Sequence, residues 1–143
     1  MQSQTICGAF MKHNLTLTIT SLLSILFMTF HFTGDTLRAK AGTPEAGGLT
    51  LITVPILLVW LYGTLVLAER RSGYIIMIVG SLLGLAMPLF HVIGAEGVFR
   101  GQLAKGNGDF LFVWTLHALG LTAMLSLVLA ARGLWGFRRS KPH

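Results

Sequence analysis

The chain has 143 residues, a mean hydropathy of +0.72, 53% hydrophobic residues and only 11% charged residues. Globular proteins carry about 25% charged residues, so the composition excludes an ordinary water-soluble domain and favours a membrane protein. The net charge is +6, but the basic residues lie at the ends of apolar segments. This placement favours membrane topology and anionic lipid, and we expect no nucleic acid partner.

Four apolar segments without Asp, Glu, Lys or Arg occupy most of the chain: 14–33, 46–68, 72–95 and 110–131. A hydrocarbon core about 30 Å thick needs roughly 20 residues of helix, and each segment reaches this length. The sequence therefore predicts an all-α fold, an integral membrane bundle of four transmembrane helices in up-down order.

The positions of the four spans define the segments between them. We expect an N-terminal tail (1–13), an outer loop (34–45), an inner turn (69–71), a second outer loop (96–109) and a basic tail (132–143). With a cytoplasmic N-terminus, the inner segments carry seven basic residues and one acidic residue, whereas the outer loops carry four of each. Basic residues in short loops stay on the cytoplasmic side. The sequence therefore predicts a multi-pass protein of a bacterial-type inner membrane, with both termini cytoplasmic.

The N-terminal region leaves two alternatives open. Met11-Lys12-His13 followed by an apolar run has the pattern of a signal peptide, with Ala39-Lys40-Ala41 as its cleavage site. The run is long enough for a complete span and this site lies well beyond its end, so we expect the first helix to be retained. Met11 is an alternative start of the chain.

The residue types in the spans exclude several kinds of chemistry. A single cysteine, Cys7, excludes an intramolecular disulfide and a CxxC redox or zinc motif. No span carries a carboxylate for proton-coupled export or a row of arginines for voltage sensing. The sequence therefore favours an accessory or small-ligand-binding membrane protein over an enzyme with its own soluble active site.

Small and aromatic residues predict how the third and fourth spans are placed. Gly80 and Gly84 form a GxxxG pair, which allows two helix backbones to approach closely. This pair serves packing within the bundle or a homodimer, and the sequence leaves both open. Trp114, near the outer end of the fourth span, is expected to anchor the helix at the membrane interface.

Three histidines lie within the predicted spans: His31, His91 and His117. The predicted topology places all three near the outer surface, at similar depths. Ionisable groups within spans are rare and usually face the interior of a bundle. We therefore treat the three histidines as one candidate site for a cofactor or a metal ion.

Three interpretations of these histidines compete. Imidazoles on facing helices hold haem b or a transition metal, which predicts a redox or metal-binding subunit. A pocket for a small polar or quinone-like molecule is the second interpretation, with the histidines as hydrogen-bond partners. In the third, each histidine bonds a neighbouring carbonyl or hydroxyl group and stabilises the bundle. A small-molecule transporter is a further alternative, and it requires an oligomer or a larger membrane complex because four helices enclose little volume.

Overall fold

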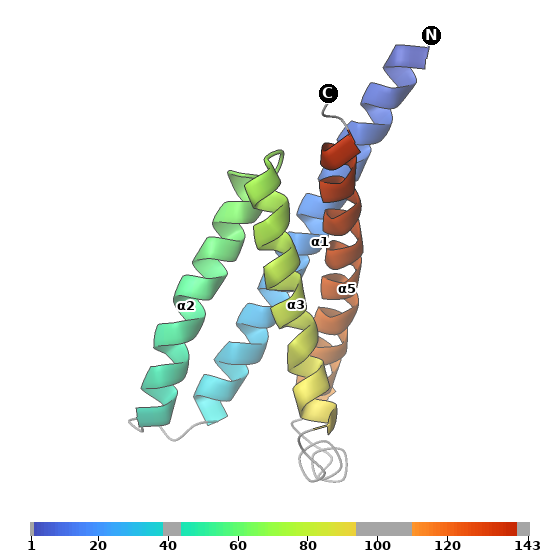
Figure 1. Ribbon diagram of the computed structural model, residues 1–143. Coiled ribbons are helices and arrows are strands. Elements are labelled where there is room, and N and C mark those ends of the chain that lie inside the picture. The colour runs from blue at the N-terminus through green and yellow to red at the C-terminus, as the bar shows by residue number, and fades with distance from the viewer. Residues whose placement is uncertain (1, 39–43, 94–109, 140–143) are drawn as a thin grey trace.

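The computed structural model is a bundle of long α-helices (Figure 1). It describes residues 2–38, 44–93 and 110–139 and, within these, the side chains of residues 13–34, 36, 51–90 and 110–136. These ranges contain four helices and no strand: α1 (Gln2–Arg38), α2 (Pro44–Leu65), α3 (Arg71–Ile93) and α5 (Phe110–Arg139). The predicted all-α fold is therefore confirmed for the described part of the chain.

Three helical segments among the described residues are long and apolar enough to cross a membrane: His13–Gly34, Arg71–Phe90 and Phe110–Gly136. The apolar segment found in α2, Leu51–Leu65, is shorter. The three long segments support an integral membrane protein, as the composition predicts.

The helices do not end where the expected spans end. α1 begins at Gln2, so nearly all of the expected N-terminal tail is helical, and α5 continues to Arg139 within the expected basic tail. Apolar spans set only a minimum helix length, since a helix continues into water wherever its sequence permits. The expected outer loop 96–109 and residues 39–43 of the other loop lie outside the described residues.

The turn between α2 and α3 begins earlier than expected. α2 ends at Leu65, and the Arg70 N–H donates a hydrogen bond to the Leu67 carbonyl at 2.9 Å. A Cβ atom at Gly73 would overlap the Leu67 carbonyl, so only glycine permits this close return of the chain. The turn therefore occupies residues 66–70, a longer segment than the expected 69–71.

Consecutive helices run in opposite directions (Figure 1). The N-terminal end of α1, the C-terminal end of α5 and the α2–α3 turn lie at one end of the bundle. α5 packs extensively against α1 and α3, whereas α2 packs less extensively against the same two helices. α1, α3 and α5 therefore form the closely packed part of the bundle, and α2 covers one side of it.

Three glycines and their neighbours fix the register between α3 and α5. The contacts are Tyr74 with Gly133, Gly84 with Ala123, and Pro88 with Gly120. In this antiparallel register Ser81 stands opposite Ser126, and both side chains are fully buried. Neither hydroxyl group has a hydrogen-bond partner among the described residues. The seam between α3 and α5 therefore places two buried hydroxyl groups at the same level.

Tyr74 joins three helices near the α2–α3 turn. It belongs to one buried apolar cluster with Leu17 of α1, and its hydroxyl group donates a hydrogen bond to Asn14 Oδ1 at 3.0 Å. The ring also lies next to Gly133 of α5, where an added Cβ would overlap it.

Gly133→Ala is therefore expected to destabilise the bundle by about 1–3 kcal/mol, because the methyl group displaces the Tyr74 ring. Gly136 provides a matched control on the same helix, since no heavy atom lies within 4 Å of a Cβ added there. Gly136→Ala should stabilise α5 by about 0.5–1 kcal/mol, because alanine has the higher helix propensity. Unfolding of both variants by SDS in mixed micelles measures the difference. Equal effects of the two changes would contradict the α3–α5 register.

The GxxxG pair is occupied by neighbours within the chain. Gly80 and Gly84 are both buried. A Cβ added at Gly80 would overlap the indole of Trp60 in α2, and one added at Gly84 would lie 3.0 Å from Ala123 Cβ of α5. The missing side chains therefore allow both α2 and α5 to pack against α3.

A short hydrogen-bond chain holds the indole in this position. The Trp60 indole N–H donates to Ser21 Oγ of α1 at 3.0 Å, and the Thr64 hydroxyl donates to the Trp60 carbonyl at 2.9 Å. Ser21 Oγ lies 2.8 Å from Thr64 Oγ1. Because the Thr64 hydrogen is already used, Ser21 is the donor in this bond. Trp60 thus joins α2 to α1 by polar contacts and to α3 by apolar packing.

Candidate functional site

A pocket between α1 and α5 contains one of the three predicted histidines, His31. Its volume is about 420 Å³. It lies where α1 approaches its C-terminal end and α5 begins, at the end of the bundle opposite the α2–α3 turn. Its lining residues are Phe27, Phe30, His31 and Gly34 of α1 and Leu111, Phe112, Trp114 and Thr115 of α5.

Helical spacing explains why these side chains meet in one pocket. Phe27, His31 and Gly34 recur at intervals of four and three residues and therefore share one face of α1. Leu111 and Thr115 are likewise one turn apart on α5. Gly34 leaves space in the wall, because no heavy atom lies within 4 Å of a Cβ added there.

The imidazole of His31 is enclosed by aromatic rings. The side chain is only 1% exposed, and both ring nitrogens are buried. Its ring centroid lies 5.1 Å from that of Phe112 on α5 and 5.8 Å from that of Phe32, with tilted ring planes. A polar, ionisable ring is thus placed in a wall that is otherwise mostly hydrocarbon.

Two further aromatic residues of the lining contact each other. The rings of Phe27 and Trp114 meet edge to face, with centroids 6.0 Å apart and planes at 75°. The Thr115 hydroxyl donates to the Phe112 carbonyl at 2.9 Å, and its oxygen remains able to accept a hydrogen bond. The polar groups on the lining are therefore few, as in most sites for small organic ligands.

His117 lies on a different face of α5 from the one that meets His31. The His117 side chain is exposed, and its Nδ1–H donates to the Val113 carbonyl at 2.8 Å, one turn earlier in α5. His117 follows Phe112 by five residues, which rotates it about 140° around the helix from the face that meets His31. Of the three interpretations of the histidines, the third predicts such a bond to a neighbouring carbonyl group.

His91 belongs to α3, but its side chain is outside the described side chains. The site of three convergent histidines therefore stays a prediction. Within the described residues, no group of three or more His, Cys, Asp or Glu side chains is arranged to hold a metal ion.

The aromatic walls of the pocket were missed by the sequence analysis. Trp114 was expected to be an interfacial anchor, and it is indeed 54% exposed, but it also lines the pocket. The sequence does contain a pattern that could have predicted these walls, because aromatic residues cluster at the same end of two antiparallel helices. They are Phe27, Phe30 and Phe32 in α1, and Phe110, Phe112 and Trp114 in α5.

Comparisons with known proteins return no match of any kind: no family model, no curated protein and no solved structure matches the chain. The geometry of the α1–α5 pocket is therefore the basis on which a function is assigned.

Proposed function

We propose that the chain is a four-span integral membrane protein that binds a small, largely apolar ligand with a hydrogen-bonding group. The α1–α5 pocket is the binding site. The observation that carries the proposal is a buried histidine, His31, in the aromatic wall of a pocket of about 420 Å³. Ligand sites typically have about 300–1,000 Å³, mostly apolar walls and a few polar groups that fix orientation.

The wall chemistry favours a planar ligand with carbonyl groups, such as a quinone. The rings of Phe27, Phe112 and Trp114 offer faces and edges for stacking. A neutral imidazole carries one N–H donor, which matches a ligand carbonyl oxygen. Both ring nitrogens of His31 are enclosed in the pocket wall, so this contact requires the neighbouring Phe112 ring to shift when the ligand enters. His31 is thus the group that orients the ligand, and the aromatic residues supply most of the contact area.

The length and apolar surface of α2 support a fourth span. α2 has 22 residues, which corresponds to a length of about 33 Å at a rise of about 1.5 Å per residue. Its outward residues are large and apolar, including Leu51, Leu58 and Leu65, which are 55–76% exposed. Apolar residues around much of a helix are typical of a membrane-embedded segment.

The distribution of charge supports an orientation with both termini in the cytoplasm. The end of the bundle with the chain termini and the α2–α3 turn carries six basic residues and one acidic residue: Lys12, Arg70, Arg71, Arg132, Arg138, Arg139 and Glu69. Basic residues favour the cytoplasmic face. In a bacterial-type inner membrane, the His31 pocket then belongs to the outer half of the bundle.

Fluorescence of Trp114 provides a test of ligand binding. The purified chain in micelles is titrated with a naphthoquinone, in a Trp60→Phe, Trp135→Phe background so that Trp114 is the remaining tryptophan. We expect saturable quenching, and His31→Phe should weaken the apparent affinity for the naphthoquinone by up to about tenfold, because one hydrogen bond contributes about 0.5–1.5 kcal/mol.

Two further variants make this test specific. His117→Phe removes an exposed imidazole from α5 and should leave the affinity unchanged. Gly34→Leu places a side chain in the pocket, where an added Cβ atom meets no neighbour within 4 Å, and should abolish saturable quenching. Quenching that rises linearly with quinone concentration, to the same extent in all variants, would contradict the proposal. A Soret absorption band that disappears in His31→Phe would instead favour a haem-binding subunit.

A further inference from the structure

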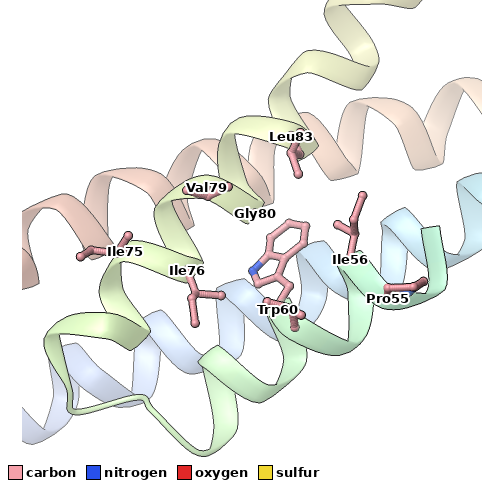
Figure 2. A pocket seen from close by; sticks show the side chains of 9 residues that line it. Pro55, Ile56, Trp60, Ile75, Ile76, Val79, Gly80 and Leu83 are labelled. Carbon is pink, nitrogen blue, oxygen red and sulfur yellow. The ribbon is translucent and has the colours of Figure 1, made fainter. Parts of the chain in front are cut away.

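A second pocket opens on the surface between α2 and α3 (Figure 2). Its volume is about 350 Å³, and its lining residues are all apolar: Pro55, Ile56, Val59, Trp60, Ile75, Ile76, Val79, Gly80 and Leu83. Figure 2 shows the Trp60 indole between the two helices, next to Gly80. We refer to these nine residues as the α2–α3 groove.

The groove has a firm floor and an exposed rim. Trp60 forms the floor and is held by its hydrogen bond to Ser21 at 3.0 Å. Gly80 has no side chain, so the indole lies directly against the α3 backbone at the base of the groove. The rim residues Val59 and Val79 are 56% and 52% exposed. The groove therefore faces the surroundings of the bundle and not its core.

A basic residue heads the row of side chains that forms the α3 wall. Arg71, Ile75, Val79 and Leu83 recur every four residues, and residues at this interval lie one above another on a helix. Arg71 is exposed at the first position of α3. The row from Ile75 to Leu83 is about 12 Å long at the helical rise, and Arg71 continues it toward the basic end of the bundle.

We propose that the α2–α3 groove binds an acyl chain of an anionic phospholipid, with Arg71 binding the phosphate group. This lipid site rests on the membrane insertion proposed above. A guanidinium group binds phosphate through paired, charge-assisted hydrogen bonds. Arg71 lies at the end of the bundle that is rich in basic residues, where anionic lipids of the cytoplasmic leaflet are attracted.

A lipid fits the groove better than a second copy of the chain. Helices associate in membranes through small residues that allow close backbone contact. The small residue of this wall, Gly80, is already covered by Trp60, and the rim consists of branched side chains such as Val59, Ile75 and Val79. A flexible acyl chain conforms to such a rim, whereas a rigid helix does not enter between these side chains.

Native mass spectrometry of the full chain tests this lipid site. The purified protein is incubated with equal amounts of phosphatidylglycerol and phosphatidylcholine that carry identical acyl chains. Both lipids carry a phosphate group, but the choline cation makes phosphatidylcholine net neutral, whereas phosphatidylglycerol is net anionic. We therefore expect about a fivefold preference for phosphatidylglycerol, the ratio that corresponds to about 1 kcal/mol per basic residue near anionic lipid. Arg71→Gln should remove the preference. Arg132→Gln, an equivalent change at an exposed arginine of α5 at the same end, should retain it.

A second pair of variants tests the groove itself. Val79→Trp fills the groove and should reduce retention of both lipids, whereas Leu82→Trp, at an exposed position of α3 outside the groove, should not. Equal retention of both lipids by the wild type, or an unchanged preference in Arg71→Gln, would overturn the lipid site. A wild-type dimer that becomes a monomer in Val79→Trp would show that a second copy of the chain, and not a lipid, occupies the groove.

Failure of the lipid site can be separated from failure of membrane insertion. Extraction of membranes with alkaline carbonate releases peripheral proteins and retains spanning ones. A retained chain without lipid preference would overturn only the lipid site, whereas a released chain would overturn the proposed insertion as well.

Discussion

Gly80→Leu is expected to destabilise the bundle by about 3 kcal/mol, a value at the upper end for overpacking of a core. Even a Cβ atom at this position would overlap the indole of Trp60. The indole is 1% exposed and donates a hydrogen bond to Ser21, so it cannot move aside without losing buried contacts. Unfolding by SDS in mixed micelles, followed by far-UV circular dichroism, measures the loss.

Two comparisons make the Gly80 prediction specific. Leu82→Phe adds bulk two residues along α3, at a side chain that is 51% exposed, and should change the free energy of unfolding by less than about 0.5 kcal/mol. Combining Gly80→Leu with Trp60→Ala should cost less than the sum of the two single changes, because the alanine leaves room for the leucine. Strictly additive effects would show that Gly80 does not pack against Trp60.

The helices could be predicted from the sequence because long uncharged segments have few alternatives in a bilayer. Their ends could not, since the length of a span says nothing about the capping and turn contacts beyond it. Gly73 illustrates this limit: its close contact with the Leu67 carbonyl sets the α2–α3 turn, and no hydropathy pattern reveals that contact.

The orientation of each helix about its own axis was harder to predict. A helix that is apolar on all sides gives no hydrophobic face to place against its neighbours. Serine within a span is the better signal here, since Ser21, Ser24, Ser81 and Ser126 are all fully buried, whereas threonines such as Thr29 and Thr33 are exposed. Histidine gives no such signal, because His31 is buried and His117 is exposed.

His31 and His117 show why the candidate site was only partly predictable. Both were placed at a similar depth from the sequence, yet His31 is buried against Phe112 and His117 is exposed. Depth follows from chain position alone, whereas the direction of a side chain depends on which face of the helix meets a neighbour. The pocket around His31 arises from the packing of α1 on α5, so no single segment contains it.

The number of membrane crossings determines on which sides the two termini lie. Three described helical segments are long enough to cross, and the apolar segment of α2, Leu51–Leu65, is shorter. If α2 crosses as well, the number of spans is even and both termini lie on the same side. If α2 stays on one side, three spans place the termini on opposite sides. We expect an even number, because α2 is a continuous helix of 22 residues with a largely apolar exterior.

Mapping both termini in intact bacterial cells tests the four-span arrangement most directly. Cys7, the single cysteine of the chain, reports the N-terminal side through a membrane-impermeant maleimide, and a fluorescent protein fused after Lys141 reports the C-terminal side. We predict that Cys7 is labelled only after the membrane is opened and that the fusion fluoresces in the cytoplasm. A phosphatase inserted within 101–108 should be active outside. Labelling of Cys7 in intact cells together with a fluorescent C-terminal fusion would place the termini on opposite sides and contradict four spans.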